Sequence, residues 1–90
     1  MGTLKTDNQI TVQILCFAQL KDWFGQSEFR MSLPKGANGH DLLTRLIEQK
    51  PSVKPLLEVS RLAVNYEYVP LDSVLREGDE VALIPPVSGG

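Results

Sequence analysis

An apolar run that meets two prolines and a diglycine decides the fold: Val81-Ala82-Leu83-Ile84-Pro85-Pro86-Val87-Ser88-Gly89-Gly90. The residues before the prolines are typical of a buried strand. Proline has no backbone N–H to donate and favours extended geometry at the residue before it, so strand pairing stops here. The sequence therefore predicts a strand over 80–84 that continues into an extended tail over 85–90, held out from the folded body.

The size and composition of the chain are those of one globular domain. Its 90 residues are 42% hydrophobic and 22% charged, with a net charge of −2, which gives no basic surface for nucleic acid. No apolar segment reaches the ~18 residues of a membrane span. We expect a cytoplasmic domain with protein partners, no nucleic acid and no membrane contact, preceded by a flexible polar lead-in over residues 1–9.

Alternating apolar residues predict two strands in the first part of the chain. The strand over 10–17 is apolar on both faces in its second half, which indicates a central place in the sheet, although Phe17 departs from the one-sided pattern. A short helix over 18–24 follows. A second strand over 27–33 then pairs antiparallel with the first across this short connection. The short helix carries an aromatic pair that we expect in the core, Trp23 and Phe24.

The main helix has the clearest capping signals in the sequence. Asn38 is a good N-cap residue, Asp41 stands where a capping-box carboxylate would, and the helix ends near Lys50. One apolar stripe faces the sheet: Leu42, Leu43, Leu46 and Ile47. The chain then predicts a short helix or turn over 52–59. Residues 61–70 predict two short strands joined by a tight turn, Asn65-Tyr66-Glu67.

These elements predict an α+β fold in which one main helix packs across a mixed sheet. The first and last strands are the most apolar, and the helix between them supplies the crossover that parallel neighbours need. We therefore expect the strands over 10–17 and 80–84 to lie side by side at the centre of the sheet. The domain would span residues 10–84, and the tail over 85–90 would leave from its middle.

The side chains offer little for catalysis by the chain itself. His40 is predicted on the surface, Cys16 as a small buried hydrophobic residue, and Asp79 and Glu80 as solvated turn carboxylates. The sequence shows no metal-ligand set and no phosphate loop, and a domain of this size leaves little chain for a pocket. What remains is the carboxylate of Gly90, which is ionised at neutral pH and becomes reactive only after activation, for example as an acyl-adenylate made from ATP.

The composition of the tail suits activation by another protein. Glycine at positions 89 and 90 lets the backbone pass where a Cβ would not fit. Pro85 and Pro86 keep the tail extended and reduce the entropy lost on insertion. A strand that runs into two prolines and a diglycine is a stronger signal than the diglycine alone.

Three stretches together resemble the small subunit of molybdopterin synthase, a sulfur carrier with the ubiquitin-like β-grasp fold. They are Ile14-Leu15-Cys16-Phe17-Ala18-Gln19-Leu20, Ala63-Val64-Asn65, and Leu75-Arg76-Glu77-Gly78-Asp79-Glu80-Val81-Ala82-Leu83-Ile84-Pro85-Pro86-Val87-Ser88-Gly89-Gly90. The resemblance covers residues 10–90 and leaves residues 1–9 outside it.

The resemblance implies a sulfur-carrier cycle centred on Gly90. An E1-like adenylyltransferase would use ATP to adenylate Gly90, and a sulfur donor would convert it to a thiocarboxylate. The carrier would then give sulfur to cyclic pyranopterin monophosphate, within a heterotetramer of two small and two large synthase subunits. The chain alone would not be an enzyme, and it would hold no permanent cofactor and no metal.

The resemblance also implies roles for residues around the tail. Phe17 and Ile84 would flank the tail at the interface with the large subunit, although Ile84 departs from the family, where both positions are often aromatic. Lys21 falls where a basic residue contacts the partner in the family. The segment that would insert into the large subunit, ahead of Gly90, is Pro85, Pro86, Val87, Ser88 and Gly89.

Two other functions stay open beside the molybdopterin carrier. A thiamin-type sulfur carrier shares the fold, but its tail usually lacks the Pro-Pro-Val-Ser segment. A ubiquitin-like modifier, conjugated to lysines of target proteins through Gly90, would start from the same adenylate. Covalent adducts that survive a denaturing wash would distinguish the modifier from the carriers.

Overall fold

The computed structural model describes residues 8–86. The predictions for residues 1–7 and for Val87, Ser88, Gly89 and Gly90 lie outside the described part of the chain. The elements in chain order are β1 (Gln9–Cys16), α1 (Gln19–Phe24), β2 (Glu28–Pro34), α2 (Gly39–Gln49), η1 (Pro51–Val53), α3 (Lys54–Glu58), β3 (Arg61–Val64), β4 (Glu67–Val69) and β5 (Glu80–Ile84).

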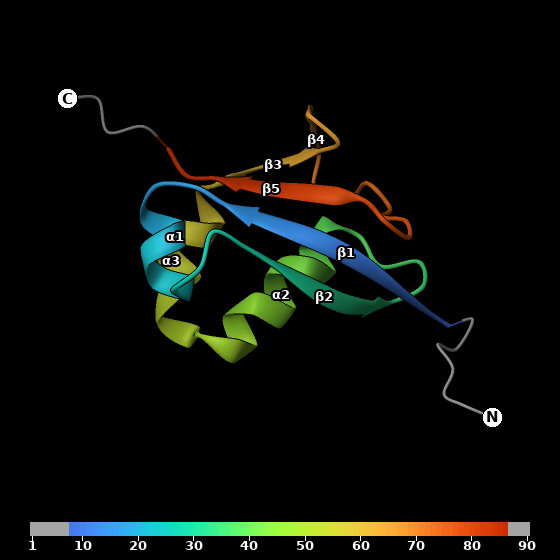
Figure 1. Cartoon of the computed structure of the whole chain (residues 1–90), viewed down its shortest axis with the longest axis horizontal. Helices are drawn as coiled ribbons and strands as arrows, with labels where there is room; N and C mark the ends of the chain where they lie inside the picture. Colours follow the sequence, from blue (N-terminus) through green and yellow to red (C-terminus); the bar gives the residue numbers. More distant parts are fainter. Residues whose placement is uncertain (1–7, 87–90) are drawn as a thin grey trace.

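Five strands form one mixed sheet in the order β2-β1-β5-β3-β4 (Figure 1). β1 and β5 run parallel with Cys16 opposite Leu83, which confirms that the first and last strands are neighbours. β2 pairs antiparallel with β1, and β3 pairs antiparallel with β5. β5 therefore occupies the middle of the sheet, and the chain leaves the domain from there.

The main helix α2 lies across one face of the sheet, and its predicted capping box is confirmed (Figure 1). The backbone N–H of Asp41 donates to Asn38 Oδ1 at 3.1 Å, and the backbone N–H of Asn38 donates to Asp41 Oδ2 at 2.9 Å. These two bonds satisfy N–H groups that a helix start would otherwise leave unpaired. The helix therefore begins where the sequence predicts.

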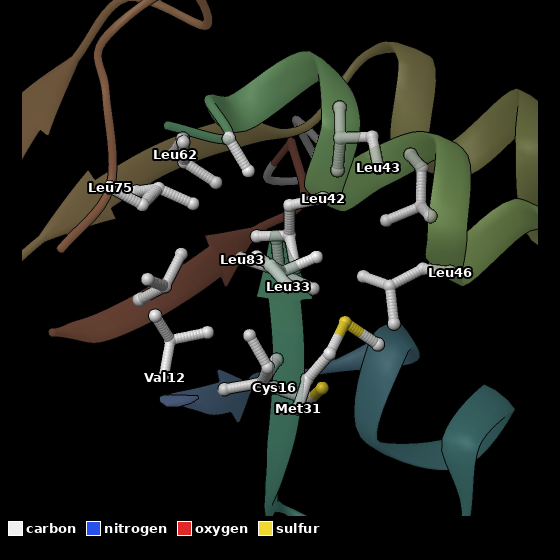
Figure 2. Packing of buried hydrophobic residues seen from close by; sticks show 14 of the residues in the cluster. Val12, Cys16, Met31, Leu33, Leu42, Leu43, Leu46, Leu62, Leu75 and Leu83 are labelled. Atoms are coloured by element: carbon white, nitrogen blue, oxygen red, sulfur yellow. The ribbon is translucent and has the colours of Figure 1, made fainter. Parts of the chain in front are cut away.

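The core fills the space between α2 and the inner face of the sheet. Figure 2 shows the α2 leucines pointing toward side chains of the strands; the labelled residues include Leu42, Leu43 and Leu46 from α2, and Val12, Met31, Leu33, Leu62 and Leu83 from the sheet. Among residues 8–86, no polar or charged side chain is buried. A five-stranded mixed sheet with one main helix across it is the predicted ubiquitin-like β-grasp.

The structure corrects the prediction for the aromatic pair of α1. Leu20 is fully buried, and Phe24 packs against Phe29 of β2 with 5.7 Å between ring centroids. Trp23, however, is 37% exposed and lies outside the core. α1 has only six residues, so only a narrow stripe of it faces the sheet. Leu20 and Phe24, which are four positions apart, occupy that stripe and leave Trp23 outside it.

Candidate functional site

The face of the sheet opposite the core is hollowed beside the point where the chain leaves it. Strand alternation sends Val81 and Leu83 into the core, whereas Ala82 and Ile84 face outward. Leu15, Ala63 and Ala82 stand opposite one another in β1, β3 and β5. A groove of about 250 Å³ lies on this face, lined by Leu15, Phe17, Ala63, Tyr66, Tyr68, Glu80, Ala82 and Ile84. We call it the outer groove.

The outer groove differs from the expectation that a domain of this size leaves little chain for a pocket. Its floor contains two alanines, Ala63 and Ala82, which face each other across β3 and β5. Small side chains at the centre, with aromatic side chains around them, leave a hollow even though the core on the other face is filled. The hollow is a surface groove for apolar contact and holds no set of catalytic groups.

Two of the sequence-predicted interface residues meet in this groove. Phe17 follows β1, is 49% exposed and lines the groove. Ile84, the last residue of β5, is half-buried and also lines it. The pairing of Cys16 with Leu83 explains this arrangement, because the next residue on each parallel strand then lies at the same end of the sheet. The aromatic residue that breaks the pattern of the first strand is therefore free for contact.

The third predicted interface residue, Lys21, is not part of the groove. It is exposed on α1, where its backbone carbonyl accepts a hydrogen bond of 2.9 Å from the N–H of Gly25. The residues that line the outer groove come from β1, β3, β4, β5 and adjoining turns, and none comes from α1. The contact role of Lys21 stays a prediction.

The root of the tail differs from the prediction. Pro85 is buried against the body of the domain, and only Pro86 is exposed. The prediction that the whole of 85–90 is held out from the fold is therefore wrong at Pro85. A proline ring is apolar, and this one directly follows the central strand, so burying it removes apolar surface from water. The four predicted tail residues beyond Pro86 lie outside the described residues.

Sequence analysis missed two aromatic residues of the groove, Tyr66 and Tyr68. Tyr68 lies in β4 opposite Ala63, and the guanidinium carbon of Arg61 sits 4.3 Å from the centre of its ring. Such a cation–π contact fixes the ring at the edge of the groove. The sequence signal that could have found Tyr68 is its expected pairing with Ala63 across the predicted hairpin, because paired residues lie on the same face of a sheet.

A pair of carboxylates borders the groove, and the structure corrects the view that both are merely solvated. Asp79 Oδ1 accepts a hydrogen bond of 3.0 Å from the side-chain amide of Asn65, and its Oδ2 accepts one of 2.8 Å from the backbone N–H of Arg76. The Glu80 carboxylate lies beside the hydroxyl of Tyr66, and hydrogen bonding and negative charge there raise the pKa of Tyr66. Asp79 is thus structural, while Glu80 shapes the groove.

The remaining candidates for chemistry stay apart from the groove. Cys16 is buried, and burial raises the pKa of its thiol to about 11, so the thiol is protonated at neutral pH. His40 is exposed in the first turn of α2. Within residues 8–86, no three His, Cys, Asp or Glu side chains gather as metal ligands would. None of the helices in that range is long and apolar enough to cross a membrane.

The chain is similar in sequence and in structure to known proteins. A molybdopterin synthase sulfur carrier subunit of Chlamydomonas reinhardtii is 40% identical over 81 residues, which are 88% of this chain and 98% of the relative. A putative molybdopterin converting factor subunit 1 from Pyrococcus furiosus superposes with a TM-score of 0.79 at 29% identity, over 87% of this chain and 99% of that one.

A third comparison concerns assembly. A chain in the complex of subunits 1 and 2 of the molybdopterin-converting factor from Helicobacter pylori superposes with a TM-score of 0.63 at 27% identity. The alignment covers 90% of this chain and all of that one, 100%. The sequence pattern of the ThiS family matches residues 14–90, which include the strands β2 to β5, the outer-groove residues and the diglycine. The chain therefore belongs to the ThiS family.

Proposed function

We propose that this chain is the sulfur carrier subunit of a molybdopterin synthase, with Gly90 as the residue that carries the sulfur. The relatives that match nearly the whole chain carry this function in their names. The structural observation that carries the proposal is the outer groove, where Phe17 and Ile84 meet immediately before the buried Pro85. A docking surface and the root of a diglycine tail thus lie together.

The proposed chemistry takes place at the carboxylate of Gly90. An E1-like adenylyltransferase joins the carboxylate to the α-phosphate of ATP and releases pyrophosphate. A donor of sulfide-level sulfur then attacks the acyl carbon, AMP leaves, and Gly90 ends as a thiocarboxylate. In the synthase the thiocarboxylate sulfur bonds to a carbon of cyclic pyranopterin monophosphate and displaces an oxygen leaving group from it. Water then hydrolyses the acyl–sulfur bond, which leaves the sulfur on the pterin and restores the carboxylate of Gly90. ATP is consumed by the activating enzyme, so the carrier itself needs no bound cofactor and no metal.

The proposed partner in sulfur delivery is the large subunit of the synthase. The Helicobacter pylori complex of subunits 1 and 2 supports such a pairing. In our proposal the tail from Pro86 to Gly90 enters the large subunit, Phe17 and Ile84 contact its surface, and Lys21 adds a basic contact. Two carriers and two large subunits form the complete enzyme, and the carrier alone has no catalytic activity.

The test is a chain that lacks Gly90. Without that residue the carbonyl to be activated is misplaced, so molybdopterin formation with the large subunit should be abolished while the thermal unfolding curve stays that of the full chain. The loaded full chain should show, by intact mass, the replacement of one oxygen by one sulfur. Molybdopterin formation by the shortened chain at the normal rate would refute the proposal. Stable adducts of the full chain with many proteins would favour the modifier function instead.

A further inference from the structure

Tyr66 occupies a backbone conformation that suits glycine. It is the second residue of the two-residue turn between β3 and β4, with φ at 73°, and Asn65 before it has φ at 51°. Two-residue hairpin turns with positive φ at both positions favour Asn-Gly. Asn65 fits this rule, but a bulky side chain at the second position is strained. The fold alone would prefer glycine at position 66.

The ring of Tyr66 contributes little to the fold in return. Its side chain is 88% exposed, the highest value among the exposed large hydrophobic residues of the described chain. Asn65 has a clear structural purpose, because its side chain bonds Asp79 and the backbone N–H of Glu80. Tyr66 instead lines the outer groove, as Glu80 does. Strain that the fold does not need points to a function for the side chain.

We propose that Tyr66 is a contact residue for docking of the large subunit, which places an apolar side chain in the outer groove against the Tyr66 ring. This inference rests on the proposed function. The four residues after Pro86 span at most about 14 Å when fully extended. A protein that holds Gly90 must therefore approach the body of the domain near Ile84, which lines the same groove. Of the two proteins that would hold Gly90 in the proposed cycle, we assign the large subunit as the occupant, because a chain of this fold at 27% identity occurs in a complex of subunits 1 and 2 of the molybdopterin-converting factor.

The chemistry of the groove selects an apolar occupant. Its lining is aliphatic or aromatic apart from Glu80, which stands at the start of β5, at the opposite end of that strand from Ile84. Aromatic rings at the wall of such a groove give a large contact area at low entropic cost. A basic occupant directed at Glu80 is the alternative that the test must distinguish.

The experiment compares Tyr66→Gly with the unsubstituted chain in two measurements. The melting temperature should be unchanged or higher, because glycine relieves the positive φ. Affinity for the purified large subunit, measured by calorimetry, should fall by about tenfold. Tyr66→Phe, which keeps the ring, should lose less affinity than Tyr66→Gly. Val74→Ala is the matched control, because Val74 is also an exposed apolar residue but does not line the groove; it should bind as the unsubstituted chain does.

Each outcome has a distinct meaning. An unsubstituted chain that does not bind the large subunit defeats the proposed function itself. Normal binding by both the unsubstituted chain and Tyr66→Gly overturns only the role of Tyr66. A clearly lower melting temperature for Tyr66→Gly shows that the ring serves the fold, which also overturns it. A larger affinity loss for Glu80→Gln than for Tyr66→Gly indicates a basic occupant and contradicts the apolar one.

Discussion

The side-chain amide of Asn65 donates a hydrogen bond of 3.0 Å to Asp79 and so ties the β3–β4 turn to the turn that precedes β5. The same side chain accepts a bond of 3.0 Å from the backbone N–H of Glu80. The backbone N–H of Asn65 completes the link by donating to the Glu80 carbonyl at 2.8 Å. One residue thus joins two turns at the end of the groove away from the tail, and it holds Tyr66 in place.

Replacing Asn65 should therefore weaken the fold more than a turn substitution on an exposed surface normally does. Asn65→Ala loses two side-chain hydrogen bonds and places a Cβ residue without a polar side chain at positive φ. We expect the free energy of unfolding to fall by about 1–3 kcal/mol, measured by urea denaturation. Asn65→Gly loses the same bonds without the backbone strain, so its free energy of unfolding should lie between those of Asn65→Ala and the unsubstituted chain. If Asn65→Ala were as stable as the unsubstituted chain, the hydrogen bonds of Asn65 between the two turns would not stabilise the fold.

The elements of this fold could be predicted because local signals agree with the global arrangement. Asn38 and Asp41 mark the start of α2, and both act as the sequence indicated. The apolar pattern of β1 and β5 predicts central parallel neighbours, which the sheet confirms. The helix cap and the apolar strand pattern each depend on a few residues close together in the chain. No nearby residues favour a different secondary structure.

The outer groove could be predicted only in part, because its shape depends on residues that are distant in the sequence. Phe17 and Ile84 were identified through a resemblance, but the alanine floor requires the register between β3 and β5. The role of Tyr66 could not be predicted for another reason. Its turn was predicted, but its unfavourable positive φ is visible only in the structure. The burial of Pro85 likewise depends on packing that no local pattern reports.

The titration of Cys16 should leave a trace in the pH dependence of stability. Its pKa rises from 9.0 to about 11 because burial disfavours the thiolate. The folded chain then binds more protons than the unfolded chain between these values, so this contribution is present below pH 9 and is lost as the pH rises toward 11. Stability should fall more steeply over that range for the unsubstituted chain than for Cys16→Val. Identical slopes would show that the thiol is not desolvated in the fold.

Phe17 and Leu20 offer a sharp separation between binding and folding, because they are three positions apart and differ in burial. Phe17 is 49% exposed, while Leu20 is 0% exposed in the core. Leu20→Ala should lower the free energy of unfolding by about 2–5 kcal/mol, because it leaves a cavity. Phe17→Ala should lower it by about 1 kcal/mol or less, since the ring is half in water already.

The order of the two variants should reverse in binding to the large subunit. At temperatures where both chains are folded, Phe17→Ala removes a groove side chain and should weaken the complex by about tenfold, measured by calorimetry. Leu20→Ala leaves every groove-lining side chain in place and should bind more tightly than Phe17→Ala. If Phe17→Ala destabilised the fold as strongly as Leu20→Ala and bound normally, Phe17 would be a core residue and the groove would lose its place in docking.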